Sequence, residues 1–251
     1  HIMSLSGRGA VSRPRMGWIG GVASRCRPRE GGKRRSEAPL DALKPLVQLI
    51  LSEITELCVP QHSSGTQPIP FCLFGYSFGS LLAYEVTREL YKAGSPPLHL
   101  FVASESCPQL VRPDVDPSLD DDIFVQQLAE FGQIQREVVD AGAEFWPVLL
   151  RPYRADLVIE RDYDNSAATD VVPCDITVFA GHDDAPLQQA GHLERWRELT
   201  SGSFGLQMLE GGHMFVHDQP DSLHKMLSRV AHDINVAAAE RYAQNVKVTS
   251  E

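Results

Sequence analysis

Ser77 lies between two glycines in the segment Gly75-Tyr76-Ser77-Phe78-Gly79, which fits the pattern G-x-S-x-G. An apolar run, FCLF, precedes the segment, and an apolar-periodic helix pattern follows it. A turn this sharp needs glycines where side chains would clash with the backbone, and it projects the serine hydroxyl at the start of a helix. The pattern therefore predicts a nucleophilic serine. The alternative is a structural serine in a glycine-rich turn.

A serine hydroxyl becomes a good nucleophile only when a base takes its proton. His213 is the best candidate, because LEGGHMFV places it in a loop directly after a predicted strand. His217 is the nearest rival, but we expect it inside the following element. His99 lies in a continuously apolar strand, where a structural role is favoured.

The base needs a carboxylate that orients its ring and stabilises the imidazolium. The segment ITVFAGHDDAP ends a predicted strand and lies between the serine and the histidine, as the required chain order demands. Asp184 is preferred over Asp183 because it gives a G-x-x-D spacing from Gly181, although the two neighbours remain alternatives. His182 is expected to be a solvated neighbour.

The elements that must position these residues alternate between helix and strand from about residue 38. Helix patterns cover 38–58, 78–93 and 192–199, and a closing helix is predicted over 222–234. The strands between them indicate a parallel, doubly wound α/β sheet. Residues 108–165 interrupt this rhythm with a Pro- and Asp-rich opening and short helical pieces, and they predict a helical insertion that covers the strand ends.

Charge and composition narrow the class of protein. The net charge is −10, yet residues 1–40 carry nine basic against two acidic side chains. We interpret residues 1–37 as a basic and atypical segment, with disorder, organellar targeting and a binding arm as alternatives. His1 and Ile2 are set aside as a cloning remnant. Five scattered cysteines suggest neither a disulfide framework nor a zinc site. Cys72 and Cys107 fit core positions.

The sequence resembles the type II thioesterases of polyketide and non-ribosomal peptide assembly lines and their animal relatives of fatty acid synthesis. The matching motifs, over about residues 34–232, are RRSEAPL, FGYSFGSLLAYEV, LLRPYRADL, VFAGHDDAP, ERW and GGHMFV. The resemblance implies an α/β-hydrolase fold over 38–236, with a helical lid at about 108–165 and a C-terminal tail at 237–251. It also implies that Ser77, Asp184 and His213 form a catalytic triad.

The resemblance further implies a substrate, an acyl group in thioester linkage to the phosphopantetheine arm of an acyl or peptidyl carrier protein. The backbone N–H of Phe78 would bind the oxyanion, and the reaction needs no metal or organic cofactor. We expect a cytoplasmic protein that binds its carrier transiently, with neither nucleic acid nor membrane as partner.

Apolar residues near the serine, near the histidine and in the lid are candidates for binding the acyl chain, with packing between lid and core as the alternative: Tyr76, Phe124, Leu128, Phe131 and Met214. Arg151 and Arg154 in the lid are candidates for docking an acidic carrier. The alternative for Arg154 is an internal salt bridge with Asp156.

The sequence departs from the family pattern before residue 34, where we expect the first strands of the sheet to be incomplete. Only GWIGGVAS (17–24) resembles the glycine loop that supplies the second oxyanion donor in the family. Two alternatives to thioester hydrolysis therefore remain: a carboxylesterase or lipase-like hydrolase, and a catalytically impaired module that binds carrier proteins.

Overall fold

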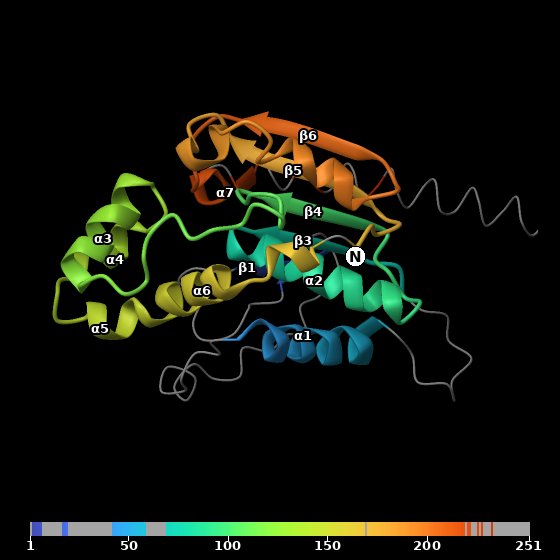
Figure 1. The fold of residues 1–251 in the computed structure, drawn as a ribbon, viewed down its shortest axis with the longest axis horizontal. Coiled ribbons are helices and arrows are strands. Elements are labelled where there is room, and N and C mark those ends of the chain that lie inside the picture. Colours follow the sequence, from blue (N-terminus) through green and yellow to red (C-terminus); the bar gives the residue numbers. More distant parts are fainter. Residues whose placement is uncertain are drawn as a thin grey trace, which may run out of the picture.

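The computed structural model describes residues 2–6, 17–19, 42–58, 69–168 and 170–218, with a few single residues beyond. One sheet of six strands, in the order β2-β1-β3-β4-β5-β6, forms its centre (Figure 1). The strands are β1 (Ile2–Ser6), β2 (Gly17–Ile19), β3 (Cys72–Tyr76), β4 (His99–Ala103), β5 (Asp175–Gly181) and β6 (Phe204–Leu209). Neighbouring strands are parallel except for β2, which is antiparallel to β1.

Helices connect the strands, as a doubly wound α/β sheet requires. The α-helices are α1 (Leu43–Cys58), α2 (Phe78–Lys92), α3 (Asp121–Glu130), α4 (Arg136–Asp140), α5 (Trp146–Leu149), α6 (Arg151–Asp162) and α7 (Phe215–Asp218). The described residues also include the 3-10 helices η2 (Asn165–Ala167), η3 (Ala185–Gln188) and η4 (Glu194–Leu199). The helix predicted over 192–199 is present over Glu194–Leu199, where it is a 3-10 helix.

The two central strands β3 and β4 are buried at every position, which explains their continuous apolar sequence. Alternate side chains enter two different clusters, because successive residues of a strand point to opposite faces. Leu100 and Val102 pack with α1 and α2 on one face. Phe101 and Ala103 pack with Phe215 of α7 on the other. Both faces of the sheet are therefore covered.

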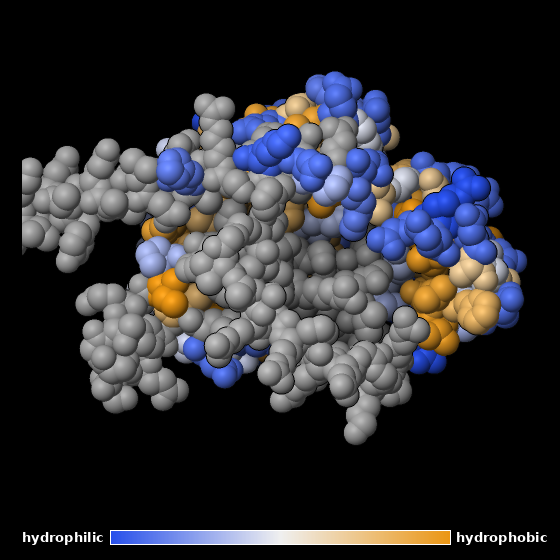
Figure 2. All heavy atoms as spheres, turned by 180° about the vertical axis from the view of Figure 1, so that it is seen from behind, coloured by the Kyte–Doolittle hydropathy of each residue, from blue (hydrophilic) through white to orange (hydrophobic). Residues whose placement is uncertain are grey.

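The insertion between β4 and β5 forms a lid of four helices, α3 to α6, beyond the carboxyl ends of the strands (Figure 1). The lid has its own small core, in which Phe124, Leu128, Tyr153 and Leu157 are buried. Apolar surface also gathers on the outside of the lid (Figure 2), where the exposed side chains include those at 145, 148 and 149. The lid is therefore a small packed unit next to the main core.

Polar contacts join the two ends of the lid to each other. The side-chain amide of Asn165, just after α6, donates to the carbonyls of Pro108 (2.7 Å) and Val111 (2.9 Å) before α3. Arg112 donates in turn to the amide oxygen of Asn165. The chain thus enters and leaves the lid at one place.

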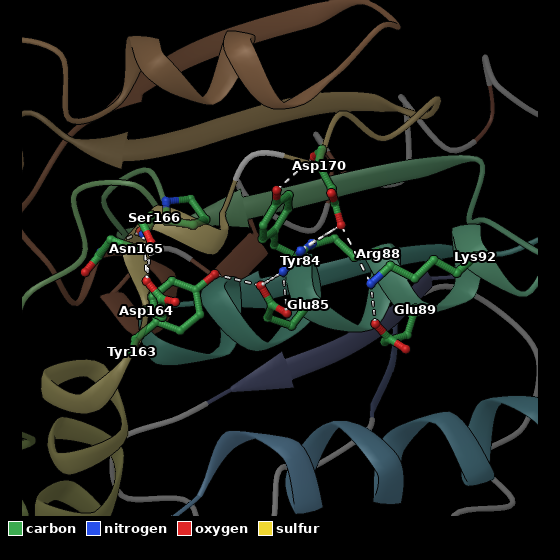
Figure 3. Close-up of polar contacts among 11 residues, drawn as sticks. Tyr84, Glu85, Arg88, Glu89, Lys92, Tyr163, Asp164, Asn165, Ser166 and Asp170 are labelled. Atoms are coloured by element: carbon green, nitrogen blue, oxygen red, sulfur yellow. Dashed lines mark hydrogen bonds and ion pairs between the residues drawn. The ribbon is translucent and has the colours of Figure 1, made fainter.

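A second polar network fixes the end of α6 to helix α2 (Figure 3). The hydroxyl of Tyr163 donates to Glu85 (2.6 Å), and Glu85 accepts from Arg88 (2.7 Å), which also pairs with Asp170 (2.7 Å). Burial, followed by the neighbouring Glu85 carboxylate, raises the pKa of Tyr163 and keeps its hydroxyl protonated as a donor. The lid is therefore anchored to the sheet domain by hydrogen bonds and ion pairs.

Strands β1 and β2 lie within residues 1–37, a segment that we expected to be atypical. Ile2, which we set aside, pairs with Cys72, and Met3 is fully buried. The rest of that segment, most of the closing helix predicted over 222–234 and the tail at 237–251 lie outside the described residues. In the part of the chain that the structure describes, no helix is long and apolar enough to cross a membrane.

Candidate active site

The turn between β3 and α2 holds Ser77 in a strained backbone conformation. Its φ is +53° and its ψ is −133°, and its N–H donates to the carbonyl of Ala103 on the neighbouring strand (2.8 Å). A Cβ atom at Gly75 would lie only 2.4 Å from the carbonyl oxygen of Gly79 and from Cα of Ser80, so no larger residue fits there. A strained serine held by its neighbours in this way is typical of a functional turn.

His213 and Asp184 complete a hydrogen-bonded chain that starts at Ser77. Oγ of Ser77 lies 3.0 Å from Nε2 of His213, and Nδ1 of His213 lies 3.1 Å from Oδ2 of Asp184. All three side chains are buried, with exposed fractions of 0%, 5% and 1%. Because β3, β5 and β6 are parallel, their carboxyl ends meet at one edge of the sheet and bring the three residues together.

The loops after β5 and β6 touch each other closely. The N–H of His182 donates to Leu209 (2.8 Å), and the N–H of Asp183 donates to Gly211 (2.9 Å). A Cβ atom at Gly181 would lie 2.3 Å from the carbonyl oxygen of Gly211. The glycine before the two aspartates therefore allows the histidine loop to approach the carboxylate.

The structure distinguishes between the two neighbouring aspartates. Asp183 is exposed and contributes its backbone N–H, whereas the Asp184 side chain is buried against His213. Its second oxygen, Oδ1, is buried and has no hydrogen-bond partner among the described residues. The preference for Asp184 therefore agrees with the geometry.

The remaining described candidates for the base are not hydrogen-bonded to Ser77. His182 is exposed, as expected of a solvated neighbour, and His217 lies on α7 with an exposed side chain. Partial desolvation and the nearby His213 lower the pKa of His217. His99 lies at the opposite edge of the sheet, where Nε2 contacts Thr177 (2.9 Å). Among the described residues, only His213 reaches Ser77 with one ring nitrogen and a carboxylate with the other.

The backbone carbonyl of His213 is held by two hydroxyl groups. Tyr76 donates to it from the end of β3 (2.9 Å), and Ser104 donates to it from just after β4 (3.1 Å). The hydroxyl of Tyr76 also lies 3.1 Å from Sδ of Met214. Sequence reasoning missed Ser104, although its place after an apolar strand at the same edge was a usable signal.

The predicted acyl-binding residues separate into two groups. Tyr76 and Met214 lie beside His213, at the edge that carries the three buried side chains. Phe124 and Leu128 are fully buried in the core of the lid, and Phe131 is 37% exposed. Packing within the lid accounts for Phe124 and Leu128.

Arg154 is also engaged within the lid. It pairs with Asp121 (2.6 Å) and lies over the ring of Phe124, 4.1 Å from its centroid. The expectation of a pair with Asp156 named the wrong carboxylate, because the start of α3 folds back onto α6.

The backbone around Ser77 includes one ready donor for a negative charge. Phe78 is the first residue of α2, so its N–H has no acceptor within the helix. The register of β1 places Ser6 beside Tyr76, so β1 ends at the same edge as Ser77. In contrast, β2 ends at Ile19 beside Ile2, at the opposite edge. Residues 17–19 of GWIGGVAS therefore run away from the edge that carries Ser77, and residues 20–24 lie outside the described residues.

The buried cysteines do not take part in this arrangement. Burial raises the pKa of both Cys72 and Cys107 to about 11, so their thiols stay protonated at neutral pH. This agrees with the core positions that the sequence indicated.

A family model described as "Thioesterase domain" matches residues 22–231. The chain belongs to this family. The gramicidin S biosynthesis protein GrsT of Aneurinibacillus migulanus is 32% identical over 187 residues, which are 74% of this chain and 68% of that protein. The human medium-chain S-acyl fatty acid synthase thioesterase is 31% identical over 197 residues, 75% of this chain and 68% of that protein.

Solved structures agree with this assignment. The RedJ thioesterase of the prodiginine pathway in Streptomyces coelicolor superposes with a TM-score of 0.66 at 32% identity, covering 78% of this chain and 74% of that one. The thioesterase domain described here is thus a thioester hydrolase with the α/β-hydrolase fold, as the resemblance predicted.

Proposed function

We propose that Ser77 is the nucleophile, His213 the general base and Asp184 the orienting acid of this thioesterase domain. We further propose that it hydrolyses acyl thioesters on the phosphopantetheine arm of a carrier protein. The observation that carries the proposal is the buried hydrogen-bond chain from Ser77 through His213 to Asp184. A buried serine, imidazole and carboxylate in this order match the requirements of acyl transfer.

The reaction begins when Oγ of Ser77 attacks the thioester carbonyl while Nε2 of His213 takes the hydroxyl proton. Collapse of the tetrahedral intermediate breaks the C–S bond, and His213 returns the proton to the departing thiol. Water then attacks the acyl-serine while the same nitrogen takes its proton. The second tetrahedral intermediate collapses as His213 returns that proton to Oγ, which releases the carboxylic acid and regenerates Ser77. Asp184 holds Nδ1–H of the ring throughout, so that Nε2 is free to accept a proton.

The N–H of Phe78 is one donor for the developing oxyanion, because it lies next to Ser77 at the free start of α2. Residues 7–16, which follow β1, lie outside the described residues. The second donor would come from another segment at the edge of the sheet where Ser77 lies.

The carrier protein is inferred from the relatives, one of which is named for gramicidin S biosynthesis and another for fatty acid synthase. An acyl group on a carrier reaches the hydrolase only when the two proteins bind each other. The domain therefore needs a docking surface for the carrier near Ser77. Arg151 at the start of α6 is exposed, whereas Arg154 is engaged with Asp121. We therefore favour Arg151 as a contact for an acidic carrier in the cytoplasm.

Hydrolysis of a phosphopantetheinylated carrier protein, loaded with short and medium acyl groups, tests the proposal. The variant Ser77→Ala should lose about 10⁴-fold or more in kcat, because nothing else forms the acyl-enzyme. Ser106→Ala is the matched control, since Ser106 is also buried and also contacts a histidine, His192, at 2.9 Å. Its activity should stay close to wild type.

Each alternative predicts a different result in the same experiment. A carboxylesterase would turn over a simple ester quickly and leave the carrier-bound thioester intact. An impaired binding module would bind the carrier, but wild type and Ser77→Ala would hydrolyse the thioester at the same rate. A phosphonate that reacts with active serines would not label such a protein. Either result would overturn the proposal.

A further inference from the structure

The carbonyl oxygen of His213 accepts two hydrogen bonds from side chains that no mechanism of acyl transfer needs. The donors are Tyr76 (2.9 Å) and Ser104 (3.1 Å), and both side chains are at least 95% buried, as is His213 itself. A buried backbone carbonyl needs at least one hydrogen-bond partner, and this one has two. Two buried hydroxyls on one carbonyl therefore fix the position of this residue strongly.

The topology explains why His213 needs to be fixed. It follows β6, whereas Ser77 follows β3, and β4 and β5 lie between these strands. Neighbouring strands are about 4.8 Å apart, so the histidine segment must cross two strands to reach the serine. The loop after β5 holds the beginning of this segment through Leu209 and Gly211. Tyr76 and Ser104 hold its far end from the side of β3 and β4.

Ser104 is held in a conformation that serine rarely adopts. Its φ is +50°, and it shares this feature among the described non-glycine residues only with Ser77. Its N–H donates to Phe179 of β5 (3.0 Å) while its hydroxyl reaches His213. Glycine would adopt this backbone without strain but carries no hydroxyl. A strained residue at such a site indicates that its side chain has a function.

Tyr76 connects the nucleophile and the base directly. It is the last residue of β3, one position before Ser77, and its hydroxyl reaches across to the backbone of His213. The hydroxyl has one proton, and the carbonyl oxygen is a stronger acceptor than Sδ of Met214. One side chain of the serine turn therefore bridges directly to the backbone of the histidine loop.

We propose that Tyr76 and Ser104 are positioning residues, which hold the His213 backbone so that Nε2 stays in reach of Ser77. The inference rests on the proposed function, in which His213 is the base. It assigns Tyr76 a role in catalytic geometry rather than in binding the acyl chain. The hydroxyls act through His213 and do not touch the reacting atoms.

The test measures kcat and KM for Tyr76→Phe, Ser104→Gly and the double variant on an acyl-loaded carrier protein. Displacing a catalytic group by about 1 Å can cost about 10²-fold, so we expect about a tenfold loss in kcat for each single variant and about 10²-fold or more for the pair. KM should change less than about twofold, because ground-state binding is untouched. Each single variant retains one hydroxyl and should fold.

Tyr84→Phe is the matched control. Tyr84 is also buried, and its hydroxyl also donates to a backbone carbonyl, that of Asp170, at 2.9 Å (Figure 3). This variant should lower the melting temperature as much as Tyr76→Phe while kcat stays at the wild-type value. If Ser104→Gly raises the melting temperature and leaves kcat intact, the hydroxyl has no positioning role and the inference is overturned.

A proton NMR signal separates this inference from the proposed function. The imidazole N–H between His213 and Asp184, identified by its absence in His213→Ala, should be sharp in wild type and Tyr84→Phe. It should be broadened by exchange with water in the double variant. Equal hydrolysis by wild type and Ser77→Ala would overturn the proposed function, whereas an unchanged N–H signal in the double variant would overturn the positioning role alone.

Discussion

Two histidines lie at opposite edges of the same sheet and are equally buried, each with 5% of its surface exposed. His213 has both ring nitrogens engaged, one by a hydroxyl and one by a carboxylate. His99 contacts Thr177 through Nε2, stacks on Phe101 and has no partner for Nδ1 among the described residues. Burial alone therefore does not distinguish the two histidines, and the proposal that His213 is the base rests on its two partners.

Truncating each histidine gives the sharpest test of this difference. His213→Ala should lower kcat on a carrier-bound thioester by about 10⁵–10⁶-fold, because the nucleophile loses its base. His99→Ala should keep kcat within about twofold and lower the free energy of unfolding by about 2–4 kcal/mol through the cavity it leaves. Steady-state kinetics and urea unfolding of both variants measure the two effects. The comparison fails if His99→Ala loses activity while it remains folded.

Substituting each of the two aspartates after β5 tests in the same way which of them acts as the partner of His213. Asp184→Asn should lower kcat by about 10⁴-fold, because an amide can hold His213 in the wrong tautomer. Asp183→Asn should have little effect, since Asp183 is exposed and its backbone N–H, which contacts Gly211, is retained. Kinetics at pH 7 to 8 measure both, and equal losses in the two variants would contradict the assignment.

The smallest expected effect is on the pH dependence of stability, and it comes from His99, at the edge opposite to His213. Burial lowers the pKa of His99 to about 4, with a weaker opposing influence from Asp175. Between pH 6.5 and 4 the unfolded chain binds a proton that the folded chain does not, so stability falls as the pH falls through this range. The loss from this group reaches about 3 kcal/mol near pH 4.

The variant His99→Gln keeps a buried polar side chain that does not titrate. Its free energy of unfolding in urea, compared with wild type at pH 7 and pH 4.5, should show a shallower decline. Other titrating groups cancel in this difference. The same decline in both proteins would mean that His99 does not titrate as its burial requires.

The sequence predicted those features that depend on short patterns. The G-x-S-x-G turn, the glycines before His213 and the aspartates after Gly181 each lie at a strand end, so local pattern was enough to bring them to one edge. The α/β architecture followed from the same alternation of strands and helices. Sequence reasoning also predicted the structural place of His99 from its apolar strand.

Other features depend on contacts between distant segments and could not be predicted. The pairing of β1 with β3 joins segments about 70 residues apart. No helix pattern follows β1 in the N-terminal sequence, so nothing there indicated a strand of the parallel sheet. Ser104 donates to the carbonyl of His213, 109 residues away, from a backbone conformation with positive φ that serine rarely adopts. Arg154 finds Asp121 because α3 folds back onto α6, which spacing along α6 cannot reveal.

The amide of Asn165, which joins the two ends of the lid, has a consequence for protein engineering. Because one side chain bonds both Pro108 and Val111, the chain leaves the sheet domain and returns to it at the same point. The stretch between these anchors is therefore a cassette that the chain enters and leaves at one point, with a second contact to α2 through Tyr163 and Glu85. Exchanging it between related hydrolases, with Asn165 and its two acceptors as the splice sites and the Tyr163–Glu85 contact retained, would transplant a lid without rebuilding the edge that carries Ser77.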